Sequence, residues 1–250
     1  MNLALLSDVH GNLPALEAVL ADIDARGDAD AVYHLGDLVG YAPWPNEVVE
    51  LLGAREIPGV AGNYDSTVAT RYKHCGCRYE DPEQEALAHL SYGWTLEHTS
   101  AETKRRLAAL PFRLDVRPLG GHVTGPRVIL LHGNPVLNTV YWTEERDDAF
   151  CLRMAESAGA RPGDLIAFGH THVPWARTVE EIHFLNTGSV GRPKDGDPRA
   201  GYARVRVDGK GVSTETVRVP YDVERAARAI LESTLPDAFA DYLRTGGRPG

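Results

Sequence analysis

Cysteine is scarce in this sequence, with three residues among 250. Cys75 and Cys77 lie close together and Cys151 lies far along the chain, a set too small and too uneven for the disulfide framework of a secreted protein. Long apolar runs are missing as well. The apolar run in the first segment, MNLALLSDVHG, is shorter than a signal peptide needs, and much shorter than a membrane span of roughly 18 residues. We therefore expect a soluble, cytoplasmic protein that does not bind membranes.

Positive charge is also in deficit. The chain has 26 lysine and arginine residues against 35 aspartate and glutamate residues, which gives a formal net charge of −9. An acidic protein repels a polyphosphate backbone, and this argues against a nucleic-acid polymer as the partner. A small phosphate ester at a locally positive site is still compatible with the charge.

The chain does contain a series of short apolar runs within an ordinary globular composition. Continuous runs are typical of strands covered on both faces of a sheet, whereas alternating runs indicate strands with one solvated face. Gly209 marks a hairpin turn between the two alternating runs. The predicted strands are 3–7, 31–36, 57–62, 127–133, 164–170, 181–188, and the alternating 202–208 and 212–219.

Helical patterns lie between the early strands and at the end of the chain. The segment 14–26 has one apolar face, with Asn12 as a cap and Pro14 in the first turn, and 45–53 repeats the scheme. Two helices are expected within 82–110, and two more at about 220–246, before a frayed end. The absence of repeats and of linker-like segments predicts one α/β domain over 1–250, with βαβαβ first and a hairpin-rich second half.

Polar side chains follow the apolar runs at the points where strands end. In parallel α/β sheets these loops converge beyond the carboxyl ends of the strands, which is where ligands bind. A carboxylate, amide or imidazole from each of five strand ends predicts a metal site assembled from distant parts of the sequence. The candidate ligands are Asp8, His10, Asp37, Asn63, His132, His170 and His172.

The number of these side chains suits two divalent ions. If Asp37 bridges the ions, the seven residues make eight bonds, and each ion keeps positions for water and substrate. Imidazole and carboxylate together favour manganese, iron, cobalt, nickel or zinc over calcium or magnesium. Two such ions produce hydroxide near neutral pH and clamp both oxygens of an in-line displacement, so the set predicts hydrolysis.

The same residues form a family signature. The blocks DVHGN, GDLVGY, GNYD, HG and GHTH span residues 8 to 172 in this order, and NTGSVGRP follows them. Together they resemble the calcineurin-like metallophosphoesterase superfamily, and its compact bacterial phosphodiesterase and phosphatase type in particular. The resemblance implies a four-layer αββα sandwich of two mixed β-sheets flanked by helices. It assigns one metal to Asp8, His10, Asp37 and His172, and the other to Asp37, Asn63, His132 and His170.

Tyr64 departs from the family pattern, which has histidine after the asparagine. That histidine is thought to protonate the leaving oxygen or to steady the phosphoryl group. The reference pKa of tyrosine is about 10, against about 6.5 for histidine, so Tyr64 is expected to be the weaker proton donor near neutral pH. Leaving groups that need protonation, such as alkoxides, should suffer most. Tyr64 contacts the substrate phosphate or else packs as a loop aromatic.

Several further residues have two interpretations each. Arg192 and Lys194 suit a substrate phosphate, or are exposed loop cations. Cys75 and Cys77 form a single Cys-x-Cys in KHCGCRYE, which predicts a loop near the mouth of the site more strongly than a metal or redox site. His34 precedes Leu35 and is expected to be a core histidine rather than a metal ligand.

The sequence thus predicts a dinuclear phosphoesterase that hydrolyses phosphodiesters or phosphomonoesters of small molecules or nucleotides. A hydroxide bridging the metals attacks phosphorus, His10 helps to hold the phosphate, and His132 neutralises developing charge. Two alternatives remain: a non-catalytic scaffold of the same fold that binds a protein, and a protein serine/threonine phosphatase. The substrate, the physiological metal (manganese is preferred) and homo-oligomer formation are left open.

Overall fold

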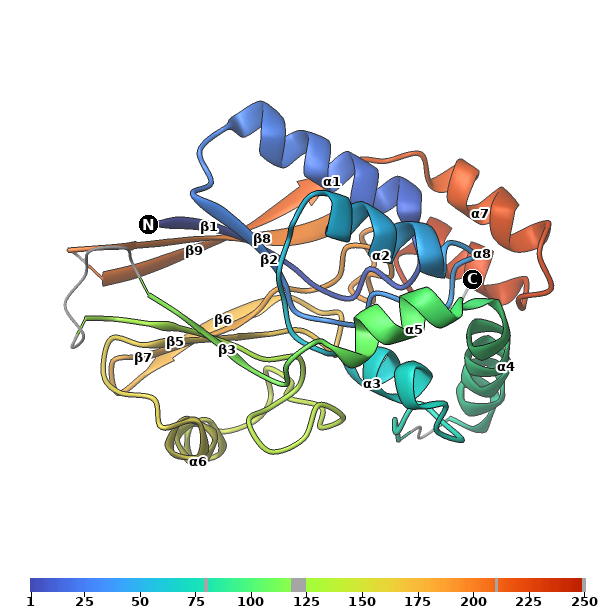
Figure 1. Cartoon of the computed structure of the whole chain (residues 1–250). Helices are drawn as coiled ribbons and strands as arrows, with labels where there is room; N and C mark the ends of the chain where they lie inside the picture. Colours follow the sequence, from blue (N-terminus) through green and yellow to red (C-terminus); the bar gives the residue numbers. More distant parts are fainter. Residues whose placement is uncertain (79–80, 118–124, 210, 249–250) are drawn as a thin grey trace.

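The computed structural model describes residues 1–78, 81–117, 125–209 and 211–248. Helices dominate its first part, and strands dominate the second (Figure 1). In chain order the elements are β1 (Asn2–Leu6), α1 (Leu13–Arg26), β2 (Ala31–His34), α2 (Pro45–Ala54), α3 (Asn63–Thr70), α4 (Pro82–His98), α5 (Ala101–Ala108), β3 (Leu114–Val116), β4 (Val128–Leu130), α6 (Asp148–Ala158), β5 (Leu165–Phe168), β6 (Trp175–Val179), β7 (Ile182–Asn186), β8 (Ala200–Asp208), β9 (Gly211–Val219), α7 (Val223–Leu231) and α8 (Ala238–Thr245).

The strands form two mixed sheets. The first has the order β2-β1-β8-β9, in which β1 and β2 are parallel and β8 runs antiparallel to its two neighbours. The second has the order β3-β4-β5-β7-β6, with a parallel centre and an antiparallel strand at each edge. Strands β8 and β9 pair as far as Asp208 opposite Gly211, so the predicted hairpin at Gly209 is confirmed. Residue 210 of that turn lies outside the described residues.

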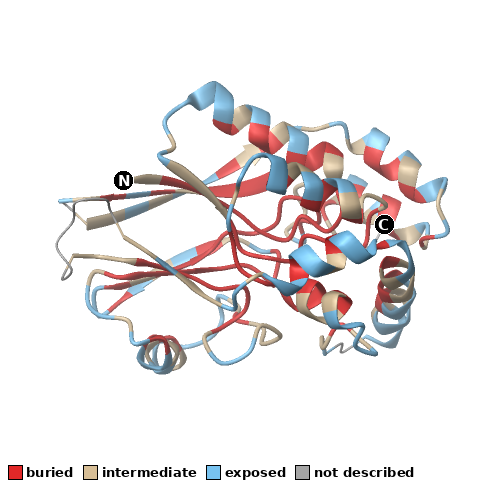
Figure 2. Ribbon diagram, viewed as in Figure 1, coloured by how far each residue is buried: buried red, intermediate tan, exposed pale blue. Residues whose placement is uncertain are grey.

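The two sheets pack face to face between outer helices, which confirms the four-layer αββα sandwich. Helices α1, α2, α7 and α8 cover the first sheet and α6 covers the second (Figure 1). The alternation of side chains along β1 shows why the strand is apolar throughout. Leu3 and Leu5 lie in the core between the sheets, whereas Ala4 and Leu6 pack against the helices. Figure 2 shows that burial is densest between the sheets and in the loops at one end of them.

The predicted strand at 57–62 is wrong. Among the described residues this segment makes a single isolated parallel bridge, between His34 and Gly59. Pro58 has no N–H to extend a ladder, and the N–H of Ala61 donates instead to the carbonyl of Pro111 at 2.8 Å. The segment then enters α3, which the sequence did not predict. The two C-terminal helices are confirmed as α7 and α8, whereas the end of the expected frayed tail, 249–250, lies outside the described residues.

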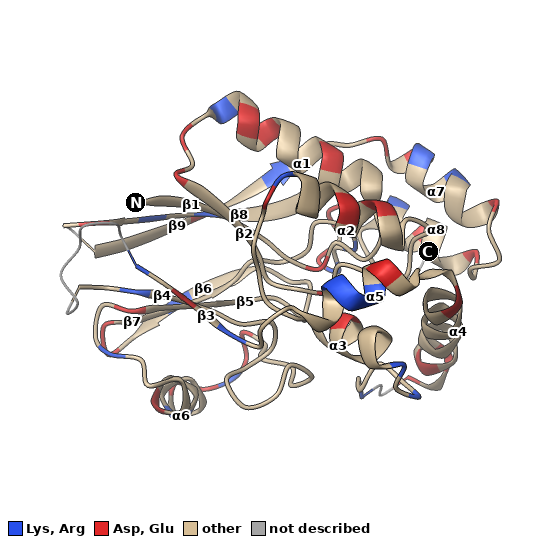
Figure 3. Cartoon of the chain, in the orientation of Figure 1, with Lys and Arg blue, Asp and Glu red and all other residues tan. Residues whose placement is uncertain are grey.

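The charged residues are concentrated on the outside of the sandwich. Acidic side chains are spread over the outer helices α1, α2 and α4 (Figure 3). None of the helices within the described ranges is long and apolar enough to cross a membrane.

Candidate metal centre

The seven candidate ligands come together at one end of both sheets, where the loops after the parallel strands meet (Figure 1). Each follows a strand by a few residues, except Asn63, which is the first residue of α3. All seven are buried, with exposed fractions of 4% or less. The loops supply Asp8 and His10 after β1, Asp37 after β2, His132 after β4, and His170 and His172 after β5.

The ligands form two groups. In the first, Asp8, His10 and His172 each place one ligand atom within 4.8 Å of the others. The Nε2 atoms of His10 and His172 are 3.1 Å apart, and Oδ1 of Asp8 lies 3.2 Å from Nε2 of His172. Ligands bound to one ion at about 2.0–2.2 Å lie roughly 3.0–3.5 Å from one another. The first group is therefore spaced for a single ion.

The second group contains Asp37, His132 and His170, whose ligand atoms also lie within 4.8 Å of one another. Nε2 of His132 is 3.1 Å from Oδ1 of Asn63 and 3.2 Å from Nδ1 of His170. Oδ2 of Asp37 lies 3.4 Å from His132 Nε2 and 3.7 Å from His10 Nε2, so this oxygen stands between the two groups.

One buried polar atom in particular fits a cation at this place. Oδ1 of Asp8 is buried without a hydrogen-bond partner among the described residues. The other carboxylate oxygen of Asp8 accepts from Ser7 Oγ at 2.6 Å and from the His170 N–H at 3.0 Å. A buried carboxylate oxygen without a donor is costly unless it faces a cation. The donor set therefore fits a divalent ion that the orphaned oxygen of Asp8 would bind.

Backbone carbonyls orient three of the imidazoles. The Nδ1 atoms of His10, His132 and His172 lie 3.0, 2.8 and 2.6 Å from the carbonyl oxygens of Val39, Leu35 and Arg192. A proton on each Nδ1 donates to the carbonyl, which leaves Nε2 as the nitrogen that would bind an ion.

Burial shifts the pKa values of these groups. It lowers the pKa of His10 to about 3, with the nearby His172 as a second cause, and that of His170 to about 4, with His132 as a second cause. Burial would lower the pKa of His132 too, but the charge of Asp37 outweighs it and raises the pKa to about 9. For Asp37, burial is outweighed by His132, which holds the pKa well below its ordinary value. The two groups therefore differ in protonation before an ion binds.

The backbone of the ligand loops is strained. Five of the seven candidate ligands have left-handed φ, namely Asp8 (53°), His10 (50°), Asp37 (53°), His170 (66°) and His172 (63°). Such residues are uncommon outside glycine and gather at functional sites. Close packing accompanies the strain, because a Cβ on Gly62 would meet Asp37 Oδ1 at 2.1 Å and a Cβ on Gly169 would meet Ser7 Oγ at 2.0 Å.

The Cys-x-Cys segment lies beside Asn63. The Asn63 amide nitrogen donates to the Cys75 carbonyl at 3.0 Å and to the Cys77 sulfur at 3.2 Å. These contacts turn the amide oxygen toward His132. The segment is thus a loop at the site, as predicted, and it also orients a candidate ligand, which the sequence did not reveal. Its last residues, 79–80, lie outside the described residues.

Tyr64 lies beside the first group and is buried. Its ring is edge-on to His10, with centroids 5.5 Å apart, and also contacts Tyr41 at 5.2 Å. Its backbone N–H donates to Oδ1 of Asp37 at 2.8 Å. Asp65, which sequence reasoning missed, accepts from the N–H groups of Leu38 at 2.9 Å and Gly62 at 3.0 Å, and so ties two ligand loops together.

The two groups border a hollow at the surface. Arg192 is buried beside it, and its guanidinium carbon lies 3.9 Å from the centroid of the Tyr41 ring. His34 lies elsewhere, buried in the core as predicted, and burial lowers its pKa to about 4. The hollow is lined by His10, Asp37, Tyr41, Tyr64, Cys77, Tyr141, His170, His172, Arg192 and Lys194.

The chain is similar to known proteins over most of its length. Residues 1–210 match the model of the calcineurin-like phosphoesterase superfamily domain. An uncharacterized protein of Methanocaldococcus jannaschii, MJ0912, is 31% identical, and the match covers 98% of each chain. The phosphodiesterase YfcE of Escherichia coli K12 is 27% identical over 79% of this chain and 84% of its own.

A solved structure agrees with these sequence matches. The metallophosphoesterase from Sphaerobacter thermophilus superposes with a TM-score of 0.74 and is 30% identical in sequence. The match covers 98% of this chain and 99% of the other. Sequence, fold and candidate ligands therefore lead to one conclusion. The chain belongs to the calcineurin-like phosphoesterase superfamily and is a metal-dependent phosphoester hydrolase.

Proposed function

We propose that the protein hydrolyses phosphodiesters, phosphomonoesters, or both, of small molecules or nucleotides at a dinuclear centre of two divalent transition-metal ions. Asp8, His10 and His172 hold one ion and Asn63, His132 and His170 hold the other, with Asp37 shared. The observation that carries the proposal is the place of Asp37 Oδ2, within 3.7 Å of a nitrogen in each group. Manganese is the first choice, with iron, nickel, cobalt and zinc as alternatives, because the donors are nitrogen and oxygen without thiolate.

Bound ions would supply Lewis acidity toward the phosphoryl oxygens and would lower the pKa of the attacking water. The protein's own contribution is orientation. Carbonyls hold three imidazoles with Nε2 inward, and the first turn of α3 holds Asp37 through the Tyr64 N–H. The positive end of the α3 dipole lies near the same carboxylate and favours its charged form.

The catalytic residues in this proposal are His10, Asp37, Asn63 and Tyr64, and Arg192 contacts the substrate. His10 lines the hollow and would help to hold the ester phosphate, while Asn63 and Asp37 would hold the ions. The burial of Arg192 against Tyr41 supports its role, because a fixed guanidinium suits phosphate oxygens.

Tyr64 stands beside His10 in this proposal as a hydrogen-bond donor to the phosphoryl group or the leaving oxygen. The residue lines the hollow, and its ring is edge-on to the His10 imidazole. Because a phenol is a weak acid near neutral pH, aryl esters should react well and alkyl esters poorly.

The experiment is a substrate panel on protein stripped with chelator. Mono- and diesters with nitrophenyl and alkyl leaving groups are assayed without metal and after adding Mn²⁺, Ni²⁺ or Co²⁺. Activity should be absent in the stripped protein and should return once about two equivalents of metal are bound. Full activity in stripped protein, or at one bound equivalent, would refute the dinuclear proposal.

A further inference from the structure

The hollow at the metal centre continues outward into a second hollow. Tyr41, Tyr141, Arg192 and Lys194 border both of them. We call the second one the outer hollow, and its remaining lining residues are Arg78, Asp81, Gln84 and Phe239. A molecule whose reacting group lies among the candidate ligands would therefore extend past Arg192 and Lys194.

Arg192 is a buried cation that no carboxylate neutralises among the described residues. The residue is 8% exposed, and aromatic rings surround its guanidinium, with Tyr41 at 3.9 Å and Phe239 at 5.8 Å from the guanidinium carbon. Rings stabilise a cation by less than a paired anion does. Burying a charge without an ionic partner is costly, and this indicates that the partner is a ligand.

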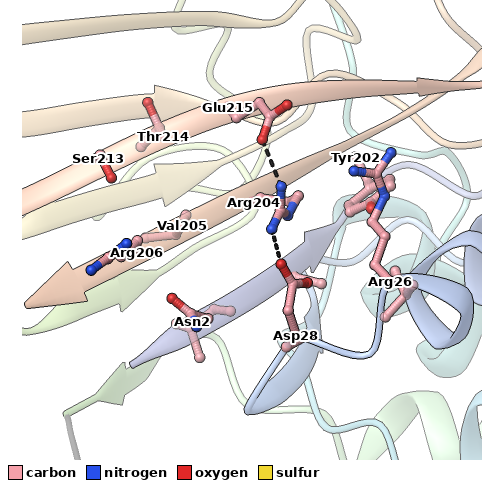
Figure 4. A pocket seen from close by; sticks show the side chains of 14 residues that line it. Asn2, Arg26, Asp28, Tyr202, Arg204, Val205, Arg206, Ser213, Thr214 and Glu215 are labelled. Carbon is pink, nitrogen blue, oxygen red and sulfur yellow. Dashed lines mark hydrogen bonds and ion pairs between the residues drawn. The ribbon is translucent and has the colours of Figure 1, made fainter.

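A hollow elsewhere on the protein shows the contrast. Between α1 and strands β1, β8 and β9, Arg204 lies between Asp28 and Glu215 and pairs with both (Figure 4). Arg206 in the same hollow pairs with Asp208. Arg26, which also lines that hollow, pairs with Asp22, so each of the described cations there has a carboxylate partner within the protein, unlike Arg192.

The charge of the outer hollow is positive although the protein is acidic. Arg78, Arg192 and Lys194 line it with Asp81 as the one carboxylate among its described lining residues, a balance of 3 − 1 = +2. The whole chain carries −9. A local positive region in an acidic protein attracts anionic ligands selectively.

We propose that the outer hollow binds a second phosphoryl group of the substrate, so that the preferred substrates are phosphoesters carrying a further phosphate. This inference rests on the proposed function, because the ester phosphorus must lie at the candidate ligands. Arg192 supplies a fork of N–H donors to the second phosphate, and Lys194 adds a charge at the exposed mouth. The reaction itself is the same hydrolysis: the oxygen of water forms a bond to phosphorus as the bond to the leaving oxygen breaks, and one proton of the water passes to the leaving oxygen, or to solvent where the leaving group departs as an anion.

The test compares 4-nitrophenyl alkyl phosphates whose alkyl chain ends in methyl, carboxylate or phosphate, with spacers of different length. The manganese-loaded protein should bind one phosphate-terminated ester with a KM about tenfold lower than that of its methyl counterpart, equivalent to one charge-assisted contact. Arg192→Gln and Lys194→Gln should each remove most of this advantage, whereas Arg204→Gln, from the neutralised hollow, should keep it.

Equal KM values for methyl and phosphate ends at every spacer length would overturn the inference while leaving the proposed function intact. An equal gain with a carboxylate end would overturn the assignment to a phosphoryl group. If the metal-loaded protein hydrolysed none of the esters, the proposed function would fail and this inference with it.

Discussion

Replacing Asp37 by asparagine changes one atom at the point that the two groups of ligands share. Oδ1 of Asp37 accepts the Tyr64 N–H at 2.8 Å, and Oδ2 faces His132 at 3.4 Å and His10 at 3.7 Å. An asparagine that keeps its oxygen toward the Tyr64 N–H must place an NH₂ group where Oδ2 stands. An NH₂ group cannot coordinate an ion, and the flipped amide would lose the hydrogen bond from α3.

We therefore expect Asp37→Asn to lower metal content from two ions toward one or none. The substitution would remove one of the two carboxylates among the candidate ligands and one bond to each proposed ion, so kcat/KM should fall by about 10³-fold, equivalent to roughly 4 kcal/mol. The loss should exceed that of any single histidine, because each histidine would contact one ion in the proposed centre. Metal analysis by mass spectrometry and hydrolysis of bis(4-nitrophenyl) phosphate measure the two effects.

A matched control is Asp28→Asn, which removes a carboxylate that pairs with Arg204 in the other hollow. It should retain two ions and nearly full activity. Thermal unfolding of both variants shows whether they fold. A folded Asp37→Asn protein that keeps two ions and a near-normal rate would refute the shared position of this residue.

Three further predictions follow from the site and the core. Tyr64→His should raise the turnover of alkyl esters more than that of nitrophenyl esters, by up to about 10²-fold. Tyr64→Phe serves as the control for the hydroxyl, and equal changes on both esters would make Tyr64 a packing residue. The pKa of His132 is raised to about 9, so the metal-free imidazole is protonated at neutral pH and must lose its proton when it binds an ion. Calorimetry of metal binding in buffers of different ionisation enthalpy should then show close to one proton released per chain at about pH 7.5, and the affinity for the metal should rise with pH up to about 9. Metal binding without proton release would contradict this. Leu165→Ala, in the fully buried core between the sheets, should cost about 2–5 kcal/mol in the free energy of unfolding by denaturant, and a cost below 1 kcal/mol would be inconsistent with this packing.

The core strands could be predicted because burial on both faces makes them apolar throughout. Strand β5 is an example, with Leu165 and Ala167 between the sheets and Ile166 and Phe168 against the helix α6. The pairing could not be predicted from such runs, because β1 joins β8 at a distance of about 200 residues in sequence, and only tertiary packing selects that partner. The apolar run at 57–62 predicts a strand, but it contains Pro58, which has no N–H to extend a ladder, and the segment forms one bridge instead.

The candidate ligands were accessible from the sequence because each is a polar residue that ends an apolar run. Their strained backbone was not, since left-handed φ at Asp8 or His170 leaves no mark on residue type. The role of Cys77 depends on a contact with Asn63 across a loop. The burial of Arg192 likewise depends on Tyr41, which is distant in sequence, so the sequence left open whether this cation contacts a phosphate or is exposed in a loop.

Anomalous diffraction from a crystal of the manganese-loaded protein tests the central claim most directly. It should show two peaks about 3.5–4 Å apart. One should be bound by Asp8, His10 and His172, the other by Asn63, His132 and His170, and the carboxylate of Asp37 should contact both. A single peak, or two peaks with Asp37 bound to one of them only, would contradict the dinuclear centre proposed for this phosphoesterase.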